Sequence, residues 1–177
     1  MEIFKLLQFI TEVLNKRQIP YMLAGSMAMN FYTVSRATRD IDIVVNLQGK
    51  DVDIFLAELE NFYYNKDTIV QEIRRKGMFN VIDNSSGFKV DVMILKDTEY
   101  NLQAFERRQV YNDLGFVVFV TALEDLIIAK IQWIQQLFSD RQANDIRMLL
   151  QNPSKDMDYI KKWCKHLKLN TFDLMNH

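Results

Sequence analysis

The segment AGSMAMNFYTVSRATRDIDIVV, residues 24–45, decides how this chain is expected to fold. It opens with Gly25-Ser26, a turn that leads into a short helix, and it closes with Asp40 and Asp42 in an apolar run. Side chains at i and i+2 of a β-strand point to the same face, so the two aspartates are expected to project together, away from the core. Neighbouring carboxylates repel each other, and a divalent cation such as Mg²⁺ removes that repulsion.

The composition is that of an ordinary globular protein. The chain has 177 residues, 49% hydrophobic and 25% charged, which suits one domain with or without a helical extension. A formal net charge of −1 excludes a nucleic-acid binder that relies on overall positive charge, although not a local basic patch. The single cysteine, Cys164, excludes an internal disulfide. The sequence shows no signal-peptide pattern and no apolar run near the roughly 20 residues of a membrane span, so we expect a cytoplasmic protein.

Hydrophobic periodicity predicts a mixed order of helices and strands. Helices are expected over residues 2–16, 27–32, 50–60, 68–75, 98–108, 121–138, 139–152 and 154–167. Strands are expected over residues 21–24, 40–46, 78–83, 88–95, 109–112 and 116–120, the last four as two hairpins. Thr68 and Thr121 have the spacing of capping boxes and are expected to begin their helices.

This order predicts an α+β (α/β) fold, a small mixed β-sheet flanked by helices with a helical C-terminal part. Strand–helix crossovers are too few for a doubly wound sheet. We expect residues 1–120 to form a catalytic core and residues 121–177 to form a helical region packed on that core.

A third carboxylate, Asp91, stands in the middle of another apolar strand, FKVDVMIL. A buried carboxylate is normally paired, hydrogen-bonded or bound to metal. If this strand lies beside residues 40–45, three acids converge at one edge of the sheet. That arrangement suits two-metal phosphoryl chemistry, in which ions about 3.5–4 Å apart stabilise the attacking and leaving oxygens. A core carboxylate paired with Arg39 is the alternative reading of Asp91.

The Gly25-Ser26 turn supplies a complementary phosphate site. A glycine allows the backbone to come close to a phosphate, and a helix N-terminus offers free N–H groups to it. The Ser26 hydroxyl adds one more donor.

Taken together, Gly25-Ser26, Asp40-Ile41-Asp42 and Asp91 resemble the DNA polymerase β-type nucleotidyltransferase superfamily, over roughly residues 20–95. The string from Arg36 to Asp42, RATRDID, is similar to that of the AbiEii-type nucleotidyltransferases of abortive-infection and toxin–antitoxin systems.

Two later segments extend the resemblance to these AbiEii-type enzymes. Residues 121–130, TALEDLIIAK, resemble the helix that carries a lysine toward the nucleotide phosphates. Residues 141–150, RQANDIRMLL, resemble the element that follows it. The chain departs from the family at Trp133, where an arginine is often found shortly after the lysine.

The resemblance implies a set of site residues. It makes Asp40, Asp42 and Asp91 the ligands of Mg²⁺ or Mn²⁺. It assigns nucleotide binding to Gly25, Ser26, Arg36, Arg39, Lys130 and Asp145, with Asp145 orienting the lysine or a substrate group. Simpler readings stay open: the two arginines neutralise the acids, Lys130 is a surface lysine whose ammonium reaches solvent, and Asp145 pairs with Arg141 along its helix.

The implied activity is transfer of a nucleoside monophosphate from an NTP to an acceptor hydroxyl, with release of pyrophosphate. The acceptor is RNA or tRNA, a protein side chain or a small molecule such as an aminoglycoside. The resemblance also implies a cognate toxin or antitoxin as partner. The alternative is a nucleotide-binding regulatory or antitoxin module that has this fold but no turnover.

Overall fold

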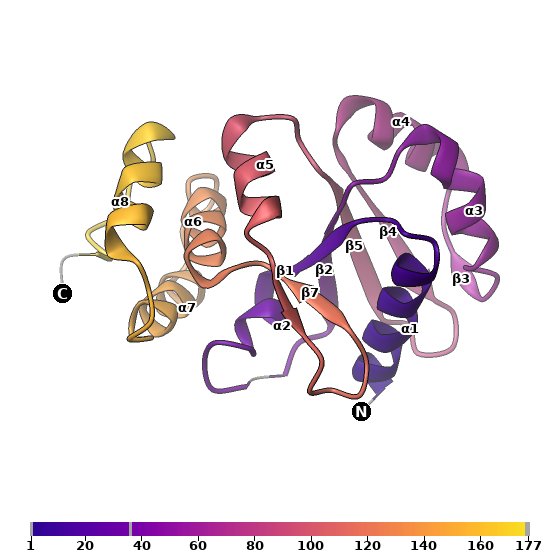
Figure 1. The fold of residues 1–177 in the computed structure, drawn as a ribbon, viewed down its shortest axis with the longest axis horizontal. Coiled ribbons are helices and arrows are strands. Elements are labelled where there is room, and N and C mark those ends of the chain that lie inside the picture. Colours follow the sequence, from indigo (N-terminus) through magenta and orange to yellow (C-terminus); the bar gives the residue numbers. More distant parts are fainter. Residues whose placement is uncertain (1, 36, 176–177) are drawn as a thin grey trace.

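The computed structural model describes residues 2–35 and 37–175, and its centre is a mixed β-sheet (Figure 1). Within these residues the sheet has seven strands in the order β3-β4-β5-β2-β1-β7-β6. The strands are β1 Tyr21–Ala24, β2 Asp40–Val45, β3 Phe62–Tyr63, β4 Met78–Asp83, β5 Lys89–Ile94, β6 Gln109–Tyr111 and β7 Val118–Val120. β2 runs parallel to β5 and antiparallel to β1, so the sheet is mixed around its centre.

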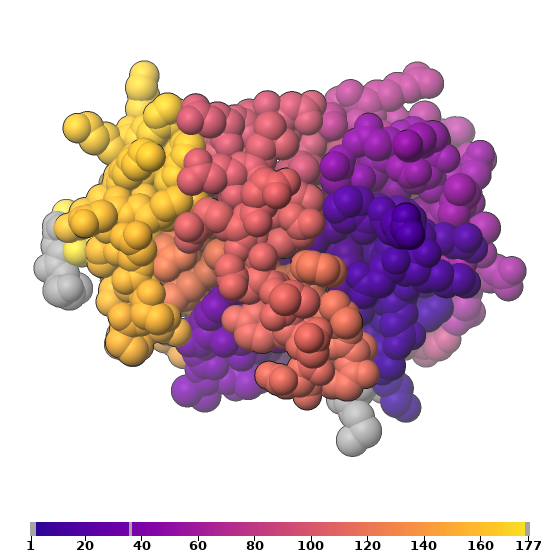
Figure 2. Space-filling model, viewed as in Figure 1, coloured from indigo at the N-terminus to yellow at the C-terminus, as the bar shows by residue number. Residues whose placement is uncertain are grey.

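Helices cover the sheet and extend beyond it. They are α1 Glu2–Lys16, α2 Gly25–Met29, the 3₁₀ turn η1 Gly49–Asp51, α3 Val52–Ala57, α4 Lys66–Arg75, α5 Glu99–Glu106, α6 Leu123–Ile134, α7 Asp140–Leu150 and α8 Met157–His166. Figure 1 shows α1, α3 and α4 toward one end of the molecule and α6, α7 and α8 at the other. On the face drawn in Figure 2, the C-terminal segment lies directly against the middle of the chain. None of the described helices has the length and apolar character needed to cross a membrane.

Alternation along β2 gives the sheet two chemically different faces. Ile41, Ile43 and Val45 are fully buried in the main core. Asp40, at the start of the strand, is exposed and Asp42 is half-buried. Because side chains alternate along a strand, the acids lie on the face opposite the isoleucines, as the sequence predicts.

A small apolar cluster covers part of the face that carries the acids. It consists of Met22, Leu95 and Phe105, with Val44 packed against it. Val44 lies one step beyond Asp42 on the same face of β2. The apolar cover is therefore adjacent to the acids on this strand.

Most predicted elements are present, including both hairpins, but two helix starts differ. The N-cap of α4 is Asn65, whose side chain accepts a hydrogen bond from the Thr68 backbone. The Thr121 hydroxyl instead donates to the Leu23 carbonyl at 2.8 Å, so α6 begins after Ala122 without a side-chain cap. Both capping-box predictions were wrong. Asn65, three residues earlier, caps α4 in place of Thr68, and the Thr121 hydroxyl bonds to strand β1 instead of its own helix.

Other element bounds also moved. α6 ends at Ile134 rather than near 138, α8 begins at Met157 rather than 154, and the helix expected over 27–32 begins at Gly25. The short strand β3 had no sequence signal and exists by pairing with the end of β4.

Candidate active site

The pairing of β2 with β5 brings the predicted acids together. In the parallel register Asp42 lies opposite Asp91, and Asp40 lies opposite Lys89. Residues in register on neighbouring strands share a face, so these four side chains lie on one side of the sheet. Burial increases across the group, from exposed Asp40 through half-buried Asp42 to Asp91, which is 9% exposed. The predicted site required the strand of Asp91 to lie beside that of Asp40 and Asp42, and the structure pairs these two strands.

The pKa of Asp42 is affected by burial and by the charged groups around it. Burial raises the pKa of its carboxyl, and the carboxylates of Asp91 and Asp40 raise that pKa further. The ammonium groups of Lys130 and Lys89 act in the opposite direction. A charged Asp42 is therefore unfavourable unless additional positive charge reaches it.

Gly25 leaves room for the Asp42 carboxylate. Its φ is +61°, a left-handed conformation that favours glycine. A Cβ at this position would lie 2.0 Å from Asp42 Oδ2, closer than any real contact. In the structure, the Asp42 carboxylate, a candidate metal ligand, lies against this glycine. Any phosphate that the turn binds would be a further neighbour.

Lys89 is a member of the site that the sequence analysis missed. Its ammonium lies 2.8 Å from Asp91 Oδ2, and the two side chains are 37% and 12% exposed. The hydrogen bond to Asp91 is the main cause of a raised Lys89 pKa, with smaller contributions from Asp40 and Asp42. The other oxygen of Asp91, Oδ1, is buried and has no hydrogen-bond partner among the described residues. The i, i+2 spacing of Lys-Val-Asp on a strand was the available signal.

Lys130 reaches the same region from α6. Its ammonium lies 2.9 Å from Asp145 Oδ2 on α7, and the two side chains are 14% and 5% exposed. Such burial contradicts the reading of Lys130 as a surface lysine. Because Lys130 also lowers the pKa of Asp42, its charge acts on the acid site.

The remaining predicted residues surround this centre less closely. Ser26 is half-buried in α2, directly after Gly25. Arg39 is exposed immediately before β2. Arg36 lies outside the described residues.

The acid site offers suitable donor atoms for a divalent cation, but not a complete set of ligands. Asp42 and Asp91 offer carboxylate oxygens, the ligands that Mg²⁺ and Mn²⁺ favour, and Asp91 Oδ1 is otherwise unsatisfied. Within residues 2–35 and 37–175, however, no three acids, histidines or cysteines stand in a geometry that would hold a metal ion. Among the described residues, the Lys89 ammonium is the cation paired with Asp91.

Comparisons with known proteins identify the fold. No family model matches the chain, and no curated protein matches it. Among solved structures it is similar to the antibiotic-resistance factor ANT(2'')-Ia in solution, with a TM-score of 0.60, 14% identity, and coverage of 93% of this chain and 90% of that chain. The crystal structure of ANT(2'')-Ia in complex with adenylyl-2''-tobramycin gives a TM-score of 0.65, 13% identity, and coverage of 95% and 98%. The predicted nucleotidyltransferase-type fold is confirmed.

Proposed function

We propose that this protein is a metal-dependent nucleotidyltransferase that transfers a nucleoside monophosphate from an NTP to an acceptor hydroxyl. One observation carries the proposal: Asp42 and Asp91 lie in register on parallel strands of a nucleotidyltransferase-type fold. Gly25 leaves room for the Asp42 carboxylate, and the charge of Lys130 acts on Asp42 from α6.

The chain supplies position and charge rather than covalent chemistry. Asp40, Asp42 and Asp91 would hold Mg²⁺ or Mn²⁺, which when bound neutralises charge on the triphosphate and the reacting oxygens. Lys130, oriented by Asp145, presents an ammonium to the phosphates. The Gly25-Ser26 turn offers further donors to them.

The proton and the leaving group are accounted for within this arrangement. The acceptor oxygen forms a bond to the α-phosphorus while the bond from that phosphorus to the bridging oxygen breaks and pyrophosphate leaves. The Asp91 carboxylate, beside Asp42 on the neighbouring strand, is the group proposed to take the acceptor proton.

The acceptor and the biological setting follow from two resemblances. Arg36 to Asp42 resemble the AbiEii-type enzymes, so RNA, tRNA or a protein side chain is one proposed acceptor class, and a cognate toxin or antitoxin is the proposed partner. The similar ANT(2'')-Ia structure contains adenylyl-2''-tobramycin, so an aminoglycoside hydroxyl is the other.

A regulatory nucleotide-binding module without turnover is the second candidate. The observation that favours it is the absence, among the described residues, of a three-ligand metal group, together with Lys89 bound to Asp91. Such a protein would bind NTP and release no pyrophosphate.

Labelled-NTP transfer separates these candidates. The protein is incubated with each α-labelled NTP, Mg²⁺ or Mn²⁺, and total RNA, total protein or aminoglycosides, and the products are resolved by size. We expect Asp42→Asn to lower transfer by about 10³-fold or more, since about 4 kcal/mol of transition-state stabilisation would be lost. The exposed-loop variant Asp113→Asn is the matched control and should retain full transfer.

Two outcomes would reject the enzyme. Transfer that is equal in wild type and Asp42→Asn would remove the acid site from the chemistry. NTP binding without a labelled product in any acceptor pool would favour the regulatory module.

A further inference from the structure

Lys89 stands inside the acid site rather than at its margin. On β5 it lies two residues from Asp91 and opposite Asp40 of β2. Its ammonium contacts Asp91 Oδ2 at 2.8 Å. Lys89 thus contacts Asp91 directly and lies on the same side of the sheet as Asp40 and Asp42.

Lys130, the other ammonium group that acts on Asp42, is already engaged. Lys130 binds Asp145 at 2.9 Å, and both side chains are largely buried. By contrast, the Lys89 side chain is 37% exposed and has a flexible four-carbon stem. Of these two ammonium groups, Lys89 is the one with room to move into solvent.

Asp91 is half-satisfied by this contact. Oδ2 receives the Lys89 ammonium, whereas Oδ1 is buried without a partner among the described residues. Burying a carboxylate oxygen without a partner is costly, so such an oxygen indicates a ligand that completes it. A divalent cation on Asp91 would place a second positive charge beside the ammonium and repel it.

We propose that Lys89 is an exchangeable counter-ion of the acid site: its ammonium occupies the cation position at Asp91 when the protein is metal-free, and a divalent cation binds there by displacing it. The inference deepens the proposed function, because it rests on the acids being a cation site. Cation affinity is then lowered by competition with Lys89.

Mn²⁺ binding measures this competition directly. We expect Lys89→Met to bind Mn²⁺ about tenfold more tightly than wild type, equivalent to about 1.4 kcal/mol, in a titration that follows free Mn²⁺ by electron paramagnetic resonance. Lys50→Met is the matched control, since it removes an exposed ammonium that forms no ion pair among the described residues. We expect its affinity to change less than twofold. Equal gains in the two variants, or no Mn²⁺ binding to either protein, would overturn the proposal.

A double-mutant cycle ties the effect to Asp91. In an Asp91→Asn background the contact between residues 89 and 91 is already weakened, so adding Lys89→Met should leave Mn²⁺ affinity nearly unchanged. A tenfold gain that persists in that background would mean that Lys89 acts on some other group, which contradicts the proposed exchange.

A wild-type measurement covers the possibility that Lys89→Met does not fold. Limited acetylation of the full chain is read by peptide mass spectrometry with and without Mn²⁺, with exposed Lys50 as internal reference. We expect Mn²⁺ to increase labelling of Lys89 several-fold relative to Lys50, because the ammonium leaves Asp91. Unchanged labelling at saturating Mn²⁺ would overturn the proposal.

The inference and the proposed function fail separately. Mn²⁺-dependent release of Lys89 without nucleotide transfer would leave the exchange intact and reject the enzyme. Transfer activity with equal Mn²⁺ affinity in wild type and Lys89→Met would retain the enzyme and reject the exchange.

Discussion

Two clusters of charged side chains in this molecule differ in how completely their oxygens are satisfied. Between α5, α6 and α8, Arg107 Nε lies 2.9 Å from Asp125 Oδ2 and its Nη2 lies 2.7 Å from Glu124 Oε2. The Tyr159 hydroxyl donates to Asp125 Oδ1 at 2.8 Å, and the Asp156 backbone N–H donates to Glu124 Oε1 at 3.0 Å. Each carboxylate oxygen of this pair therefore has a partner, whereas Asp91 Oδ1 has none among the described residues.

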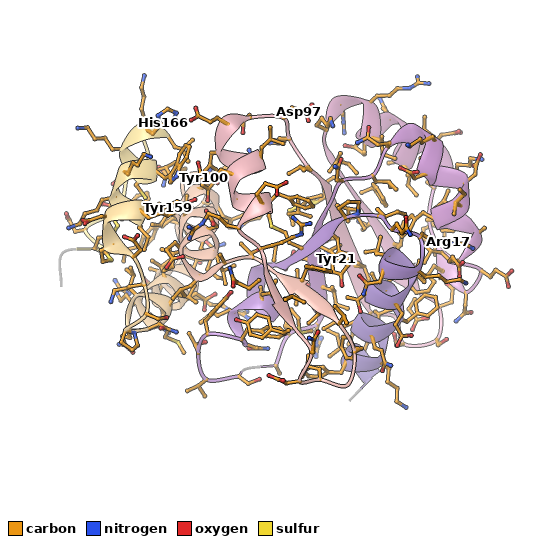
Figure 3. The ribbon with its side chains drawn as sticks, in the orientation of Figure 1. Arg17, Tyr21, Asp97, Tyr100, Tyr159 and His166 are labelled. Carbon is orange, nitrogen blue, oxygen red and sulfur yellow. The ribbon has the colours of Figure 1, made fainter. Side chains whose placement is uncertain are left out.

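The positions of the two clusters explain the contrast. Figure 3 shows Tyr100 of α5 and Tyr159 of α8 close together in the part of the molecule where these helices meet. The Arg107 guanidinium lies 4.0 Å from the centre of the Tyr159 ring, which adds a cation–π contact. This cluster fastens α8 to the rest of the chain and is complete. Among the described residues, the acids of β2 and β5 leave Asp91 Oδ1 without a hydrogen-bond partner, which is what a site that binds a ligand would show.

Breaking the complete cluster should have the largest effect on stability. Arg107→Met leaves Glu124 and Asp125 without their cation, and Asp125 is only 1% exposed. Loss of one partner of a buried ion pair costs about 3 kcal/mol or more, so we expect Tm to fall by about 6–12 °C in thermal denaturation followed by circular dichroism.

The neighbouring Arg108→Met is the control for this prediction. Arg108 packs over Phe105 and Phe119 and donates to the Phe105 carbonyl, but forms no ion pair among the described residues. A fall in Tm as large as that of Arg107→Met would show that packing, rather than the carboxylates, accounts for the loss.

At the open cluster, Gly25→Ala should cost about 2–3 kcal/mol and abolish nucleotide transfer. The left-handed backbone alone costs about 1–2 kcal/mol for a residue with a Cβ, and here that atom would also meet the Asp42 carboxylate. Gly87→Ala is matched in conformation, with φ +72° but no atom within 4 Å of its Cβ. Equal losses of stability and activity in both variants would mean that Gly25 does not position Asp42.

The smallest expected effect on stability is that of Asp42→Asn, and it is a gain rather than a loss. Because the pKa of Asp42 is raised, the folded protein holds its proton to higher pH than the unfolded chain does. Stability from this group is therefore complete below the unfolded pKa of about 3.9 and is lost as pH rises through the folded pKa. Without metal at pH 7, Asp42→Asn should be more stable than wild type, although it is inactive.

Chemical denaturation in EDTA across pH checks this prediction. The advantage of Asp42→Asn should shrink as pH falls toward 4, whereas Asp113→Asn should follow wild type throughout. An Asp42→Asn variant that is less stable at pH 7 would mean that the Asp42 charge is already compensated, as the charges of Glu124 and Asp125 are.

Much of the fold was readable from local patterns. The alternation of DIDIVV predicted β2 and its two faces, and the helix expected from residue 139 is present as α7, with Ser139 as its N-cap. The same logic failed at Thr121, because its hydroxyl bonds to β1 rather than to its own helix. A local sequence pattern predicts only local contacts. It cannot predict a hydrogen bond between a side chain and a strand far away in the sequence.

The sequence by itself determined that Asp40 and Asp42 share a face and that Asp91 interrupts another apolar strand, because period-two alternation is a property of any strand. Only the tertiary structure decided that Asp91 lies beside Asp42, that Gly25 makes room for the Asp42 carboxylate, and that Lys89 binds Asp91. Those relations depend on strand order, register and burial. They arise from the packing of segments far apart in the chain, which no local spacing records.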